Sequence, residues 1–231
     1  MSYGLKVIND ASYVQIDSES PRLCAIYNGT YSAGSRIAIV TFPSPVRTPE
    51  PPCIFIRNSP AQADYVYDGA TITGSAGNWT GFQLSANNVN WRPAGKWFCA
   101  VFATIAQGNY GMRLWGADGG LVFDSGTTPV IVTRASNSLS YRGYYLHPVL
   151  GSTNYYTFNN LGNGTALLED EYFMMNPFSK GVLYNANPMT AGIRWNYGSN
   201  ELQFFTFTNQ PGAGWTNQGS PGAVLARLPG T

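Results

Sequence analysis

Charged residues are scarce in this sequence. Asp, Glu, Lys and Arg make up 11% of its 231 residues and the formal net charge is +1, whereas ordinary soluble domains carry about 25% charged residues. A protein that binds the phosphate backbone of nucleic acids needs a basic surface, so we expect no nucleic-acid partner. A surface with so little charge tends to associate, and we expect neighbouring subunits to cover much of it.

Residues that usually carry catalysis or bind metals are also few. The single histidine, His147, precedes Pro148, and a serine triad would need that residue as its base. The three cysteines, Cys24, Cys53 and Cys99, lie in apolar surroundings and not in Cys-x-x-Cys spacing, which predicts buried, unpaired thiols. We therefore predict no enzyme activity, no metal site and no cofactor.

The only acidic cluster is Glu169-Asp170-Glu171. Carboxylates this close could belong to a calcium site or to the acid pair of a glycosidase. Neighbouring residues of a strand point to opposite faces, however, and this favours a solvated edge. No apolar run is long enough to span a membrane, and the N-terminus has no signal-peptide pattern. We therefore expect neither membrane insertion nor export.

Aromatic residues, glycine and proline are abundant by contrast, with 14% aromatics, 26 Gly and 15 Pro. Short runs that alternate apolar and polar residues, separated by Gly, Pro and Asn, recur along the chain and predict an all-β protein. The predicted strands are 22–27, 36–42, 53–57, 63–68, 80–84, 96–103, 129–134, 142–146, 154–158, 192–195, 201–207 and 224–228. Asn28-Gly29 is predicted as a turn, the proline-rich residues 43–52 as a loop, and residues 165–175 as either helix or strand.

One motif occurs twice. Residues 110–125 (Tyr-Gly-Met-Arg-Leu-Trp-Gly-Ala-Asp-Gly-Gly-Leu-Val-Phe-Asp-Ser) align without a gap with residues 3–18 (Tyr-Gly-Leu-Lys-Val-Ile-Asn-Asp-Ala-Ser-Tyr-Val-Gln-Ile-Asp-Ser). Each copy predicts a β-hairpin, in which Gly permits a close backbone approach and Asp-Ser caps the following turn. The duplication predicts two β-sandwich-like units built around these hairpins, residues 1–107 and 108–231, with an alternative boundary near residue 136.

Both copies resemble a hairpin of short tail proteins from long-tailed, siphovirus-like bacteriophages, many of them in families known only as domains of unknown function. Such proteins often begin Met-Ser-Tyr-Gly-Leu and carry Tyr-Gly-Leu/Met-x-Val/Leu, Asp-x-Gly and Leu-Val-Phe-Asp-Ser segments. The first copy departs from this pattern, because Ser12-Tyr13 stands where the turn glycine would be and Gln15 replaces the valine. The resemblance covers the two hairpins and their approaches.

The resemblance implies a structural virion protein of the tail tip or the tail-fibre attachment region. Such a protein is made in the host cytoplasm, binds other phage tail proteins and contributes to host attachment. It also implies a homo-oligomer, either a trimer or copies around a trimeric or hexameric hub.

The aromatic residues suggest where binding takes place. Six tryptophans are more than cores of this size need, and several stand beside Asn and Gly. Rings in such settings suit a protein interface or the face of a sugar. The candidate binding residues, for an interface or a glycan, are Trp91, Tyr144, Tyr155, Trp195 and Trp215. The alternative function is therefore a carbohydrate-binding module that recognises cell-surface glycans.

Overall fold

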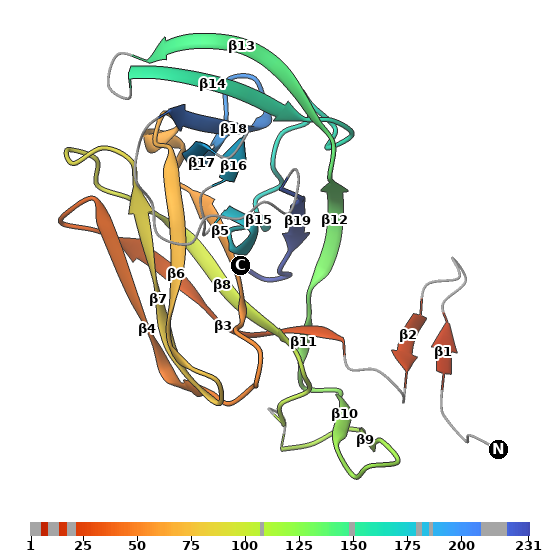
Figure 1. Cartoon of the computed structure of the whole chain (residues 1–231). Coiled ribbons are helices and arrows are strands. Elements are labelled where there is room, and N and C mark those ends of the chain that lie inside the picture. The colour runs from red at the N-terminus through yellow and green to blue at the C-terminus, as the bar shows by residue number, and fades with distance from the viewer. Residues whose placement is uncertain are drawn as a thin grey trace.

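The computed structural model describes residues 6–8, 14–17, 22–106, 109–147, 151–178, 182–184, 187–208 and 221–231. Its elements are nearly all strands (Figure 1), and all the strand pairs described are antiparallel. The predicted all-β, sandwich-like fold is confirmed. The strands are β1 (Lys6–Ile8), β2 (Val14–Asp17), β3 (Leu23–Ser32), β4 (Ile37–Val46), β5 (Cys53–Asn58), β6 (Tyr67–Ser75), β7 (Asn78–Ala86), β8 (Ala94–Phe102), β9 (Arg113–Trp115), β10 (Leu121–Asp124), β11 (Thr128–Pro129), β12 (Ile131–Ser136), β13 (Leu139–His147), β14 (Gly151–Phe158), β15 (Glu171–Met174), β16 (Val182–Tyr184), β17 (Asn187–Asn196), β18 (Glu201–Thr208) and β19 (Ala223–Arg227), and the two short 3-10 helices are η1 (Pro60–Gln62) and η2 (Asn176–Phe178).

Two large sheets pack face to face. One has the strand order β11-β3-β8-β5-β15-β19-β12, and the other has the order β13-β14-β18-β17-β6-β7-β4, with β16 beside β17. Alternate residues of each strand face the space between the sheets, where both contribute to one apolar core. Phe82 of one sheet meets Trp97 of the other edge to face, with ring centroids 5.3 Å apart. Each fully buried side chain of this size stabilises the fold by roughly 1.5–3 kcal/mol.

The seven-stranded sheet closes on itself. Its two edge strands, β11 and β12, are consecutive in the chain and separated by Val130 alone. The Val130 amide donates to the Leu23 carbonyl at 3.0 Å, which continues the pairing of β11 with β3. The closed sheet has its own interior, in which Phe55 stacks on Phe98 at 4.5 Å and Phe98 meets Tyr172 edge to face. The central strands β8, β5 and β15 are therefore buried on both faces along much of their length, as their nearly continuous apolar sequences require, whereas the edge strand β12 is mostly exposed.

The two large sheets do not divide where the repeat predicted. Strands from before residue 107 pair with strands from after residue 136 in both sheets: β5 with β15, and β6 with β17. The predicted units 1–107 and 108–231, and the alternative boundary near residue 136, are therefore wrong as a division of the sheets. The physical reason is that neither half holds enough strands to close the seven-stranded sheet.

Two local predictions are also corrected. Residues 28 and 29 do not form a turn: they continue β3 and pair with β8, and the Trp97 ring lies 3.3 Å from where a Cβ on Gly29 would stand. The prolines at 43 and 45 do not end β4. The pairing of β4 with β7 skips from Thr41 to Val46, and β4 is an edge strand. Proline is tolerated there because no ladder donor is needed.

Candidate functional site

The two repeated hairpins have the same strand pairing. In β1–β2, Lys6 pairs with Asp17, and Val7 with Ile16. In β9–β10, Arg113 pairs with Asp124, and Leu114 with Phe123. Each paired residue of the second hairpin is 107 positions after the corresponding residue of the first. The register of strand pairing also shifts at the corresponding position in both hairpins. The repeat seen in the sequence is therefore a repeat of backbone structure.

The second hairpin explains why its motif begins with Tyr-Gly and ends with Asp-Ser. Gly111 has φ +119°, and a Cβ there would lie 2.0 Å from the Ser125 hydroxyl oxygen. That hydroxyl accepts the Met112 amide at 3.0 Å. The buried Asp124 carboxylate accepts Arg113 Nε at 2.8 Å and caps the Gly126 amide at 2.7 Å. The predicted turn cap by Asp124 and the need for Gly at a close approach are confirmed for this copy, whereas Ser125 bonds back to Met112 instead of capping the following turn.

The second hairpin also exposes large apolar side chains. Tyr110 is 93% and Trp115 is 59% exposed, and Met112 is exposed as well. A surface hollow of about 310 Å³ lies among Asn109, Tyr110, Gly111, Arg113 and Trp115. Both hairpins stand at the same end of the molecule, where β2 approaches β10 (Figure 1). Aromatic side chains exposed together on a projecting element are typical of a contact surface.

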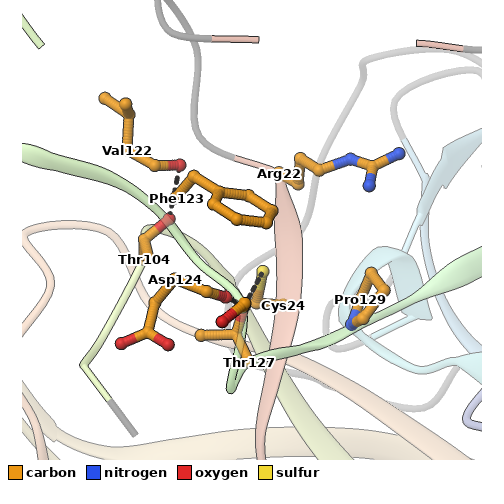
Figure 2. A pocket seen from close by; sticks show the side chains of 9 residues that line it. Arg22, Cys24, Thr104, Val122, Phe123, Asp124, Thr127 and Pro129 are labelled. Atoms are coloured by element: carbon orange, nitrogen blue, oxygen red, sulfur yellow. Dashed lines mark hydrogen bonds between the residues drawn. The ribbon is translucent and has the colours of Figure 1, made fainter. Parts of the chain in front are cut away.

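A pocket of about 300 Å³ lies where this hairpin joins β3 (Figure 2). Its walls come from Arg22, Cys24, Thr104, Val122, Phe123, Asp124, Ser125, Thr127 and Pro129. The Thr104 hydroxyl donates to the Val122 carbonyl at 2.7 Å, and the Thr127 hydroxyl donates to the Asp124 carbonyl at 2.8 Å. The first bond attaches the hairpin to the chain that follows β8, and the second closes the turn after β10.

The three cysteines are free, as predicted. Cys24 and Cys99 are buried, but Cys53 is only half-buried, which corrects the prediction for that residue. Burial raises the pKa of all three thiols. Each is therefore protonated near neutral pH and is a weak nucleophile, because the thiolate is the reactive form.

Trp91 and Tyr155, two of the predicted binding residues, come together on the outer face of the eight-stranded sheet. Both pack against a small buried cluster formed by Val66, Phe205 and Phe207. The Tyr155 ring lies nearly parallel to that of Phe205, with centroids 6.1 Å apart and an angle of 25°. Trp91 stacks on Tyr65 at 4.8 Å. Aromatic residues from separate strands and a loop thus form one region.

A groove of about 170 Å³ opens beside Tyr155. Its other described walls are Arg194 of β17 and Gln203 and Phe205 of β18. The Arg194 guanidinium lies 5.2 Å from the Phe205 ring centroid and donates through Nε to the Gln203 amide oxygen at 2.8 Å. The groove therefore combines an aromatic wall with polar groups held in fixed positions.

The sequence predictions missed Arg194, Gln203 and Phe205. A signal for Phe205 was present, because Phe204 and Phe205 are consecutive. Adjacent strand residues face opposite sides, so two neighbouring phenylalanines indicate apolar surroundings on both faces of β18. Phe204 does lie in the core between the sheets, and Phe205 belongs to the outer cluster.

The other predicted binding residues lie elsewhere. Trp195 is 1% exposed in the core between the sheets, with Arg134 above its ring. Trp195 faces the core because neighbouring residues of a strand point to opposite sides, and Arg194 faces the groove. Trp195 therefore cannot serve as a surface contact, and its prediction as a binding residue is corrected. Tyr144 is exposed on β13, and its role in an interface stays a prediction. Trp215 lies outside the described residues.

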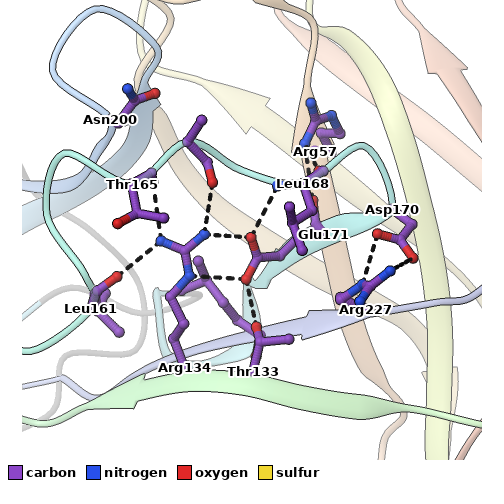
Figure 3. A network of polar contacts seen from close by, with 12 residues as sticks. Arg57, Thr133, Arg134, Leu161, Thr165, Leu168, Asp170, Glu171, Asn200 and Arg227 are labelled. Atoms are coloured by element: carbon purple, nitrogen blue, oxygen red, sulfur yellow. Dashed lines mark hydrogen bonds and ion pairs between the residues drawn. The ribbon is translucent and has the colours of Figure 1, made fainter.

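Two residues of the acidic cluster, Asp170 and Glu171, form ion pairs with arginines (Figure 3), whereas Glu169 is exposed. Glu171 is buried and accepts Arg134 Nε at 3.0 Å and the Leu168 amide at 3.2 Å. The same guanidinium donates to the carbonyls of Leu161, Thr165 and Ala166. Asp170 forms a two-point ion pair with Arg227, with both N–O distances 2.8 Å. The expectation of a solvated edge is therefore wrong for Glu171, which fixes the loop before β15.

Comparisons with models of known protein families, with curated proteins and with solved structures give no match for this chain. Among the residues that the structure describes, there is no helix with the length and apolar character needed to cross a membrane.

Proposed function

We propose that this protein is a structural component of a bacteriophage tail, located in the tail tip or the fibre-attachment region. It acts by binding other tail proteins and has no catalytic role. Copies of the chain stand around a trimeric or hexameric hub, and in this position the protein contributes to host attachment. The observation that carries the proposal is the duplicated hairpin, whose two copies have the same pairing and the same irregularity.

Three features support an assembly role. The hairpins stand outside the two large sheets as separate two-stranded sheets, so the core does not require them. Both are at one end of the molecule (Figure 1), and the second exposes Tyr110, Met112 and Trp115. Interfaces are enriched in Tyr, Trp and Met and depleted of Lys and Glu. A chain with 11% charged residues has a surface of that composition.

The proposal is tested by incorporation into particles. Tyr110→Ser with Trp115→Ser removes the exposed rings of the second hairpin without disturbing the core. A matched control, Ile39→Ser with Val89→Ser, removes two exposed apolar side chains elsewhere. We expect the control protein to be recovered in purified tails at the wild-type level and the hairpin variant to be lost from them. Equal recovery of both variants, or absence of the wild-type chain from tails, would contradict the proposal.

A further inference from the structure

We propose that the groove formed by Tyr155, Arg194, Gln203 and Phe205 binds a neutral pyranose sugar. This site lies away from the hairpins: in Figure 1, β14 and β18 lie at the top, β9 and β10 at the bottom, and β1 and β2 at the lower right. The proposal goes beyond the tail assignment and does not depend on it.

The groove has an aromatic ring and polar side chains, and these match the apolar face and the hydroxyl groups of a sugar ring. One face of a pyranose carries C–H groups and packs on an aromatic ring, as other apolar surfaces do. Tyr155 supplies such a ring, held nearly parallel to Phe205 beneath it. Sugar hydroxyls both donate and accept hydrogen bonds, and they need planar polar partners around the ring edge. Gln203 and Arg194 line the same groove and provide them.

The polar groups are in place before any ligand binds. Gln203 is 7% exposed, and the Arg194 side chain is 13% exposed. Arg194 is fixed by Gln203, by the Phe205 ring and by the Asp64 carboxylate, which lies 3.2 Å from its guanidinium. The Gln203 amide oxygen is occupied by Arg194 Nε, which directs its amide NH₂ away from that bond as a donor. Side chains already ordered in this way lower the entropic cost of binding.

Charge and size select the ligand. The exposed Asp64 carboxylate pairs with Arg194 and offsets part of its positive charge, so an acidic sugar would have to compete with Asp64. A volume of about 170 Å³ holds about five or six water molecules at about 30 Å³ each. This is room for a single ring with its hydroxyls. The geometry therefore fits one neutral sugar unit of a longer glycan.

Saturation-transfer NMR on the full chain tests the site, with glucose, galactose, rhamnose and N-acetylglucosamine as separate probes. We expect transfer to the ring C–H protons of at least one probe. Tyr155→Ala should weaken binding of that probe about tenfold, the effect expected for loss of one aromatic face. Tyr141→Ala is the matched control, because it removes an exposed tyrosine of the neighbouring strand β13 that lies outside the groove, and it should leave binding unchanged.

A measurement on the wild-type chain keeps the test independent of folding in the variants. Addition of the binding sugar should shift the NMR signals of the Gln203 side-chain amide and of Arg194 Nε–H. No transfer to any of the four probes would overturn the proposal, as would binding that Tyr155→Ala leaves intact or shifts confined to other residues. None of these results would bear on incorporation of the hairpin variants into tails, so the two proposals fail separately.

Discussion

Among the residues that the structure describes, Asp68 is a carboxylic acid whose ionisation opposes folding. Burial raises the pKa of its carboxyl from 3.8 to about 6, although Arg36, 3.6 Å away, favours the charged form. A carboxyl whose pKa is raised in the folded state binds its proton more tightly there than in the unfolded chain. Stability therefore falls as the pH rises from 3.8 through 6, by about 3 kcal/mol in total.

Replacement of Asp68 by Asn should remove this effect, because the amide resembles the protonated acid and cannot ionise. We expect Asp68→Asn to match the wild type near pH 4 and to exceed it in free energy of unfolding by about 3 kcal/mol near pH 7.5. Urea unfolding at a series of pH values measures the difference. If the two proteins keep the same difference in stability from pH 4 to pH 7.5, the raised pKa is refuted.

Glu171 and Asp170 are neighbours with different energetic roles. Glu171→Leu leaves the Arg134 guanidinium without its buried carboxylate and should cost about 3–5 kcal/mol. Asp170→Asn should cost much less, because its pair with Arg227 is near the surface and solvent screens it. Thermal and urea unfolding of the two variants give the comparison. Equal losses would show that burial of Glu171 does not determine the strength of its ion pair.

At the scale of single elements, the second hairpin depends on Gly111. An alanine there would have to adopt φ +119° and would place its Cβ against the Ser125 hydroxyl. We expect Gly111→Ala to destabilise the hairpin by about 1–3 kcal/mol and to speed hydrogen exchange at the Met112 and Ser125 amides. The core sheets should exchange as before.

Gly34→Ala is the control for this experiment, because a Cβ at Gly34 meets no atom within 4 Å and its φ is not in the left-handed region. It should leave exchange in the hairpin at the wild-type rate. Wild-type exchange in Gly111→Ala as well would mean that the Tyr-Gly and Asp-Ser ends of the motif do not depend on each other.

Local features were the ones that the sequence allowed us to predict. The second hairpin, its turn and the cap by Asp124 follow from residues close together in the chain. The groove did not follow, because Tyr155 and Arg194 lie on strands that the chain brings together only through β18. The sequence analysis selected tryptophans that stand beside Asn and Gly, and Asn196 follows Trp195, but this pattern does not show which face of a strand is buried. Trp195 was therefore predicted as a binding residue although it is buried.

At the scale of the whole molecule, the repeat suggested two units, but the large sheets form one. Repeated hairpins indicate duplication of a local element, whereas strand pairing across long distances in the chain decides which sheets form. The closed sheet needs β3, β8 and β5 from the first half of the chain and β15, β19 and β12 from the second. No local pattern in the sequence records that requirement.

This architecture predicts that residues 1–107 and 108–231 do not fold when produced separately. Each half would expose apolar strand edges and half of the core between the sheets, so neither should give a dispersed NMR spectrum or a cooperative unfolding transition. The full chain is the positive control. Cooperative unfolding of either half alone would show that it is an independent domain and would restore the division predicted from the repeat.

The central claim, that this chain is a structural component of a phage tail, is tested most directly by cryo-electron microscopy of purified tails. The account predicts density for the two-sheet fold in several copies around a three-fold or six-fold axis at the tip or the fibre attachment, with Tyr110 and Trp115 buried against a neighbouring subunit. Tails in which no density fits the fold, or in which the hairpin of each copy faces water and touches no other chain, would contradict it.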